Sequence, residues 1–137
     1  MEVWKIRSLE DWRFGGLGIQ TLKQAMNADE RQFLLTAAWM FMRHGQPARA
    51  RTVCEALVEE DARDGVAAVA LAELMLDAGE AARAVEVLRA ADVPPDLLHA
   101  AAFLETRALR EGGRNREAAN RWSRYLESRK GAERRWM

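Results

Sequence analysis

Few side chains in this sequence have the types and spacing that catalysis or metal binding requires. The histidines, His44 and His99, lie far apart in the chain, and Cys54 is the single cysteine. One thiol and two scattered imidazoles do not supply the ligand set of a zinc site. The sequence contains no HExxH, CxxC, GxGxxG or GxxxxGKS/T motif. A phosphate-binding loop follows a strand, whereas the glycine-rich residues 15–18 follow no clear strand. We therefore expect no cofactor, no metal and no enzymatic activity.

Glycine and alanine recur at a fixed spacing that points instead to a repeat. Gly45, Gly79 and Gly113 are 34 residues apart, and each is followed five residues later by an alanine. Each glycine ends a helix-like apolar run, and each alanine lies inside the next run. A 34-residue period of helix, glycine turn and helix is typical of a tetratricopeptide array, which binds other proteins through a surface.

The pattern predicts an all-α fold with three tandem tetratricopeptide-like helix pairs, which form a short right-handed solenoid with a concave groove. Asn27 can cap the first helix with Glu30 in a capping box, Gly45 can take the left-handed conformation that ends it, and Pro47 suits the first turn of the next helix. Asp64 can cap the third helix, and Pro94 with its neighbour stops the fourth. The predicted helices cover about 28–44, 47–60, 64–78, 81–91, 96–111 and 115–128, in units 31–64, 65–98 and 99–132.

Equivalent positions of the three units predict the core. Small residues are needed where two helices cross closely, and large apolar residues fill the space between them. The expected close contacts are Ala50, Ala84 and Ala118, and Ala38, Ala72 and Thr106; the expected large core residues are Phe41, Met75 and Leu109, and Cys54, Leu88 and Trp122.

Two segments lie outside the repeat of residues 28–128. Residues 1–27 contain Trp4 and Trp12, and we expect a short helical segment there that packs on the array, on another protomer or on a partner. Residues 129–137 form a basic tail. The chain starts without the apolar region of a secretory signal, and no apolar stretch is long enough to span a bilayer. A single cysteine suits a reducing compartment, so we expect a cytoplasmic protein that does not insert into membranes.

Charge is balanced overall, but residues 55–86 are mainly acidic and residues 107–137 mainly basic. This asymmetry has two interpretations: solvated helix faces that differ in sign, or electrostatic selection of a partner or of a second copy. Nucleic-acid binding through the basic end is a third class of function, which the zero net charge and the lack of a recognition motif disfavour.

The first helix of each unit lines the concave face of such an array. Trp39 and Phe103 are the expected anchor contacts, since aromatic residues often dominate binding energy. The groove suits an amphipathic helix or an extended peptide with apolar anchors. Alternatively, residues 1–27 or a second protomer cover it. The predicted lining residues are Leu35, Trp39, Met42, Val69, Glu73, Leu76, Phe103, Arg107 and Arg110.

The sequence from Phe33 to Leu126 resembles the small tetratricopeptide-like chaperones of bacterial type III secretion. The resemblance is carried by residues 38–42, 44–50 and 53–58 of the first unit, by Ala78-Gly79-Glu80 and Ala84 of the second, and by Gly113, Ala118 and residues 122–127 of the third. The units lack the tryptophan-leucine-glycine start of standard tetratricopeptides and the usual proline near each unit's end.

The resemblance implies a non-enzymatic, cytoplasmic chaperone of translocators or of early export components. It would hold an amphipathic segment of a secreted or export-apparatus protein in its groove, as a heterodimer, with Arg107 and Arg110 paired with acidic residues of that segment. Without a partner the chain could form a homodimer. The alternative is a tetratricopeptide adaptor or assembly subunit of a larger complex, with no release step.

Overall fold

The computed structural model describes residues 27–136, so the predicted N-terminal segment lies outside the described residues. The chain divides into two compact units, Met1–Ala56 and Leu57–Met137. Of the described residues, the first unit contains one complete helix and most of a second, and the other contains the remaining helices.

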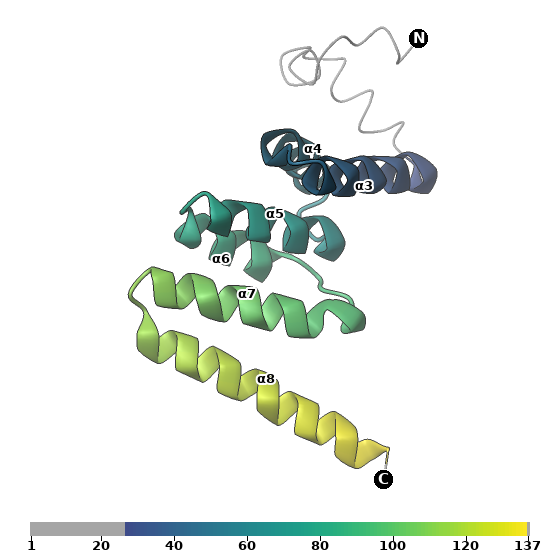
Figure 1. Ribbon diagram of the computed structural model, residues 1–137. Coiled ribbons are helices and arrows are strands. Elements are labelled where there is room, and N and C mark those ends of the chain that lie inside the picture. Colours follow the sequence, from purple (N-terminus) through teal and green to yellow (C-terminus); the bar gives the residue numbers. More distant parts are fainter. Residues whose placement is uncertain (1–26, 137) are drawn as a thin grey trace, which may run out of the picture. The chain divides into compact units, whose positions relative to one another are not determined.

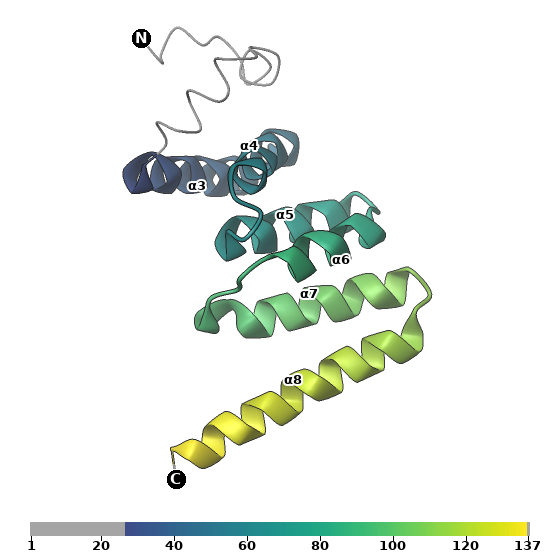
Figure 2. The ribbon, with the colours of Figure 1, turned by 180° about the vertical axis from the view of Figure 1, so that it is seen from behind.

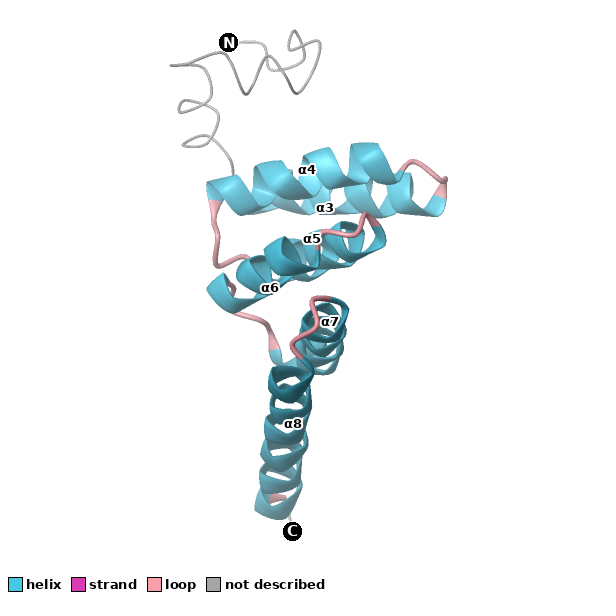
Figure 3. Cartoon of the chain, turned by 90° about the vertical axis from the view of Figure 1, so that its left-hand side faces the viewer, coloured by secondary structure: helices cyan, strands magenta, loops and turns pink. Residues whose placement is uncertain are grey.

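The described residues are almost entirely helical and contain no strand, so the predicted all-α class is confirmed (Figure 1). Short loops, pink in Figure 3, join consecutive helices. The elements are α3 (Ala28–Arg43), α4 (Pro47–Glu60), α5 (Gly65–Asp77), α6 (Ala81–Ala90), the 3-10 helix η2 (Pro95–Leu97), α7 (Leu98–Glu111) and α8 (Asn115–Arg135).

The three repeated glycines form the same turn. Gly45, Gly79 and Gly113 have φ values of 69°, 79° and 78°, in the left-handed region that a residue without Cβ adopts at little cost. After each glycine, the next residue donates its N–H to the carbonyl five residues earlier: Gln46 to Phe41, Glu80 to Met75 and Arg114 to Leu109, each at 2.8 Å. Each glycine N–H bonds the carbonyl three residues earlier. These are the bonds of a Schellman motif, so the sequence period is also a period of local structure.

Two predicted caps are confirmed. The side chain of Asn27 accepts a hydrogen bond from the N–H of Glu30 at 2.9 Å, and that of Asp64 accepts one from Ala67 at 3.2 Å. The Glu30 carboxylate accepts from the Asn27 side-chain amide at 3.4 Å and not from the Asn27 backbone N–H, so the cap forms without the reciprocal half of the predicted capping box.

The linker from α6 to α7 is extended and passes close to the start of α5 (Figure 2). The N–H of Asp92 donates to the carbonyl of Arg63 at 2.9 Å, and the side chains of these two residues form an ion pair. A Cβ on Gly65 would lie 2.2 Å from the carbonyl oxygen of Asp92. Gly65 is therefore required by this close approach, and the linker then enters η2 at Pro95.

Of the helices α5 to α8, α5 is the most buried and α8 the least. Most of α5 is buried, because it packs against both α6 and α7 and its sequence is apolar on nearly every side. α7 packs against α6 and α8, whereas Ala118 is the buried residue of the long α8. The small residues predicted at close contacts are buried: Ala38, Ala50, Ala72, Ala84 and Ala118.

The predicted end of the last helix near Ser128 is wrong, because α8 continues to Arg135. Ion pairs one turn apart support the extra turns, with Arg129 3.4 Å from Glu133 and Lys130 3.7 Å from Glu127. Up to Arg135, the predicted basic tail is therefore part of a helix.

Candidate protein-binding site

A buried carboxylate fixes α7 between its neighbours. Glu105, on α7, has an exposed fraction of 7%. It accepts a hydrogen bond from Nε of Arg121 on α8 at 2.9 Å and another from Nε of Arg89 on α6 at 3.2 Å. Because one carboxylate joins three helices, it determines where the side chains of α8 lie relative to α7.

An aromatic cluster joins the start of α7 to α8. The His99 ring lies edge-on to Trp122 and to Tyr125, with centroid distances of 5.8 and 5.6 Å. Nδ1 of His99 is 3.1 Å from the Tyr125 hydroxyl. These contacts orient the Trp122 indole, which is half-buried and faces a pocket on its other side.

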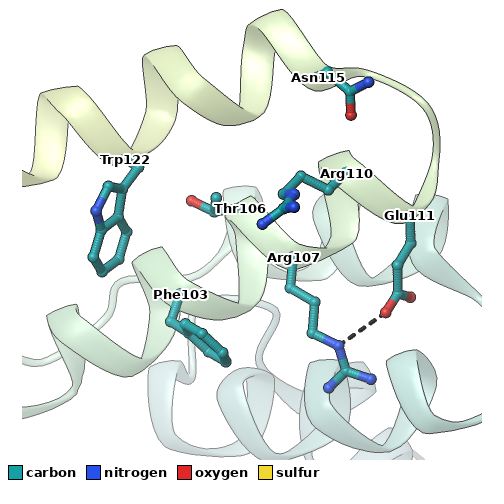
Figure 4. Close-up of a pocket in the computed structure, with 7 residues that line it drawn as sticks. All are labelled: Phe103, Thr106, Arg107, Arg110, Glu111, Asn115 and Trp122. Atoms are coloured by element: carbon teal, nitrogen blue, oxygen red, sulfur yellow. Dashed lines mark hydrogen bonds and ion pairs between the residues drawn. The ribbon is translucent and has the colours of Figure 1, made fainter.

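This pocket lies between α7 and α8 and has a volume of about 630 Å³. Phe103 and Trp122 form an apolar end, and arginine, glutamate and asparagine side chains form a polar end (Figure 4). Phe103 is 54% exposed, which leaves much of its ring in solvent. The lining residues are Phe103, Thr106, Arg107, Arg110, Glu111, Asn115 and Trp122.

The two arginines of the pocket differ in their partners. Nε of Arg107 is 2.9 Å from the Glu111 carboxylate, and its Nη2 is 3.8 Å from Asp77. Within residues 27–136, Arg110 has no ion-pair partner. Figure 4 shows Arg110 directed into the pocket and Arg107 turned toward Glu111. The unneutralised positive charge of the pocket is therefore that of Arg110.

A further ion pair supports the start of α8. The guanidinium of Arg114 donates two hydrogen bonds to the Glu117 carboxylate, at 2.9 and 2.6 Å. This hydrogen bonding is the main cause of a lowered pKa for Glu117 and of a raised pKa for Arg114. A carboxylate in the first turn of α8 also interacts favourably with the helix dipole.

The structure brings together three of the predicted groove residues, Phe103, Arg107 and Arg110, in the α7–α8 pocket. On α5, Glu73 is exposed, but Val69 and Leu76 have exposed fractions of 9% and 3% and belong to the core. The predicted residues on α3 belong to the other unit: Trp39 is exposed, and Leu35 and Met42 are half-buried.

Sequence reasoning missed the contribution of α8 to the pocket. Trp122 was predicted to fill a core position equivalent to Cys54 and Leu88, which are buried. An indole is much larger than either side chain, so it extends out of the same position and lines the pocket. The larger size of Trp122 at this repeat position is the sequence signal that could have identified it as a pocket residue. Thr106 is likewise larger than Ala38 and Ala72, which occupy the equivalent positions of the other units. Its hydroxyl oxygen is buried without a hydrogen-bond partner.

Chemically, the pocket offers apolar surface, one available cation and hydrogen-bonding groups. Residues 27–136 contain no cluster of three or more His, Cys, Asp or Glu side chains placed to hold a metal ion. Cys54 is buried. None of the helices described is long and apolar enough to cross a membrane. The arrangement is suited to binding another molecule by contact and charge.

Comparison with known proteins adds no assignment to this geometry. No protein-family model matches the chain, and the curated proteins contain no match to it.

Proposed function

We propose that this chain is a non-enzymatic protein-binding module of tetratricopeptide-like helix pairs, and that it acts as a cytoplasmic chaperone of a bacterial type III secretion system. It holds an amphipathic segment of a secreted or export-apparatus protein and keeps that segment from aggregating. The repeat assignment is supported by the three Schellman turns at Gly45, Gly79 and Gly113, which recur with the period of the sequence.

The observation that carries the binding function is the exposed Phe103 ring in an open, arginine-containing pocket. Burying a phenylalanine completely contributes about 1.5–3 kcal/mol. With 54% of Phe103 exposed, roughly half of that stabilisation remains for a partner to gain by covering the ring. Aromatic and arginine side chains are also the types most enriched among residues that dominate binding energy.

The assignment to export rests on the resemblance of residues 33–126 to the secretion chaperones. A permanent adaptor would use the same pocket but would not release its partner. The two functions therefore differ in the fate of the partner and not in the geometry of the pocket.

Co-expression with the product of each neighbouring reading frame tests the proposal. A tag on this chain should recover one partner at stoichiometric yield, and that partner should be insoluble when it is expressed alone. Phe103→Ala should reduce the recovered partner severalfold, because it removes the exposed aromatic anchor. Phe33→Ala is the matched control, since Phe33 is a 72% exposed phenylalanine on α3, in the other unit.

Equal recovery with both variants would show that the pocket is not the binding site. A partner that is recovered but never exported would favour the adaptor. A partner-free dimer would indicate that a second copy occupies the groove.

A further inference from the structure

The polar end of the α7–α8 pocket indicates the charge of the partner segment that it binds, whereas the apolar end does not. Phe103 and Trp122 accept any apolar side chain, because contact with a ring surface selects only by size and shape. Selection by charge depends on Arg107, Arg110 and Glu111, which line the same pocket.

These three side chains do not contribute equally. Glu111 neutralises Arg107 through the 2.9 Å contact, and Asp77 is also within 3.8 Å of Arg107. A carboxylate of the partner would have to compete with both acids for Arg107. Arg110 has no such competitor among the described residues, and it points into the pocket (Figure 4).

We infer that the pocket binds an acidic segment of the partner protein, with an apolar side chain against Phe103 and a carboxylate on Arg110. Arg107 contributes less to this selection, because it is already paired with Glu111. This inference rests on the proposed function, because it describes the partner of the same site. It assigns the selection of acidic partners to Arg110 alone, whereas the sequence predicts that both arginines pair with the bound segment.

The spacing of the two contacts fixes the spacing within the partner. Phe103 and Arg110 are seven residues apart on α7, which is about 10 Å along the helix axis. A partner helix that lies along α7 therefore presents its apolar side chain and its carboxylate about two turns apart. Either direction of the partner helix satisfies this spacing.

Two synthetic peptides of about 18 residues, roughly five helical turns, test the inference. Both have a central leucine anchor and the same helix-forming background. One has glutamate at the positions seven residues before and after the anchor, and the other has lysine at those positions. Binding of each fluorescein-labelled peptide to the full chain is measured by anisotropy at low and at high salt.

The glutamate peptide should bind more tightly, by roughly threefold to tenfold. Its glutamate forms an exposed ion pair with Arg110, whereas the lysine of the other peptide is repelled by Arg110. High salt should reduce this difference. Arg110→Glu should reverse the preference, and Arg110→Gln should abolish it. Arg107→Gln should change the preference less than Arg110→Gln does. Far-UV circular dichroism of each variant verifies that the helices are intact.

Equal binding of the two peptides, or a preference that persists in Arg110→Glu, would overturn the inference. If Phe103→Ala weakens both peptides while Arg110→Gln changes neither, the pocket binds protein without selecting acidic residues, and the proposed function survives. Failure of both peptides to bind overturns the inference, whereas a partner recovered by co-expression would still support the proposed function. Self-association that Phe103→Ala abolishes would mean that a second copy occupies the pocket, which also overturns the inference.

Discussion

Gly65→Ala should destabilise the protein, although alanine is the better helix former. The added Cβ would lie 2.2 Å from the carbonyl oxygen of Asp92, 2.7 Å from Cδ of Pro94 and 2.8 Å from Cα of Val93. Real Cβ atoms essentially never come within 3.0 Å of such neighbours. All three atoms belong to the linker between α6 and α7 and two are backbone atoms, so no side-chain rotation can relieve the contact.

The magnitude follows from two opposing effects. Replacing glycine by alanine within a helix contributes about 0.5–1 kcal/mol of stability. Forcing an extra carbon into a closely packed site costs typically about 1–3 kcal/mol, and more when the backbone has to move. The contacts of Gly65 are unusually short, and the displaced linker also carries the hydrogen bond from Asp92 to Arg63. A packing cost of about 3 kcal/mol, at the top of that range, less the gain from helix propensity, gives an expected net loss of about 2 kcal/mol.

Gly131→Ala is the matched control. Gly131 lies within α8, and a Cβ there has no neighbour within 4 Å. This variant should gain about 0.5–1 kcal/mol from helix propensity alone. Urea denaturation followed by circular dichroism at 222 nm measures both changes in the free energy of unfolding. If Gly65→Ala proves as stable as Gly131→Ala, the linker does not pass as close to α5 as the structure shows.

Three further predictions concern buried and paired polar groups. Thr106→Val should raise the free energy of unfolding, measured by urea titration, by about 1 kcal/mol, because a methyl group replaces a buried hydroxyl that has no hydrogen-bond partner. A loss of stability would mean that the hydroxyl does form a hydrogen bond. Glu105→Ala should cost about 2–4 kcal/mol in the same assay, because two arginines lose a shared carboxylate, and an unchanged midpoint would contradict this. The pKa of Glu117, followed by NMR, should lie below its ordinary value and rise in Arg114→Ala. Since the folded-state pKa is lowered, the stabilisation from this pair is present above the unfolded-state pKa and is lost as the pH falls through the folded-state pKa.

Local features of the fold could be predicted from the sequence because their causes are local. A left-handed residue at the end of a helix favours glycine, and a carboxylate or amide favours the cap position, so the turn at Gly79 and the cap at Asp64 follow from a few neighbouring residues. The end of α8 was missed because no such signal stands there: Gly131 lies in a segment of good helix formers with ion pairs on both sides, and the helix continues through it.

Features that depend on which helices meet could not be predicted in this way. Val69 and Leu76 have the right period for a groove, but burial depends on the neighbours that pack against α5. Nothing in the sequence distinguishes Glu105 from the glutamates that are exposed. Its burial arises because Arg89 and Arg121, 16 residues away on either side, meet it from two other helices.

The position of Glu105 explains why α7 can hold an open pocket and still be fixed between its neighbours. Two residues separate Glu105 from Phe103, so the two side chains lie roughly 160° apart around the helix. The carboxylate joins α7 to α6 and α8, and Phe103, on the other side of α7, lines the pocket between α7 and α8. Apolar packing on both sides would fix the helix as well, but it would fill the space beside Phe103. Because the ion pairs of Glu105 fix α7 relative to α6 and α8, Phe103 and Arg110 are left exposed at the pocket. This is the surface through which we propose that the chain selects a partner.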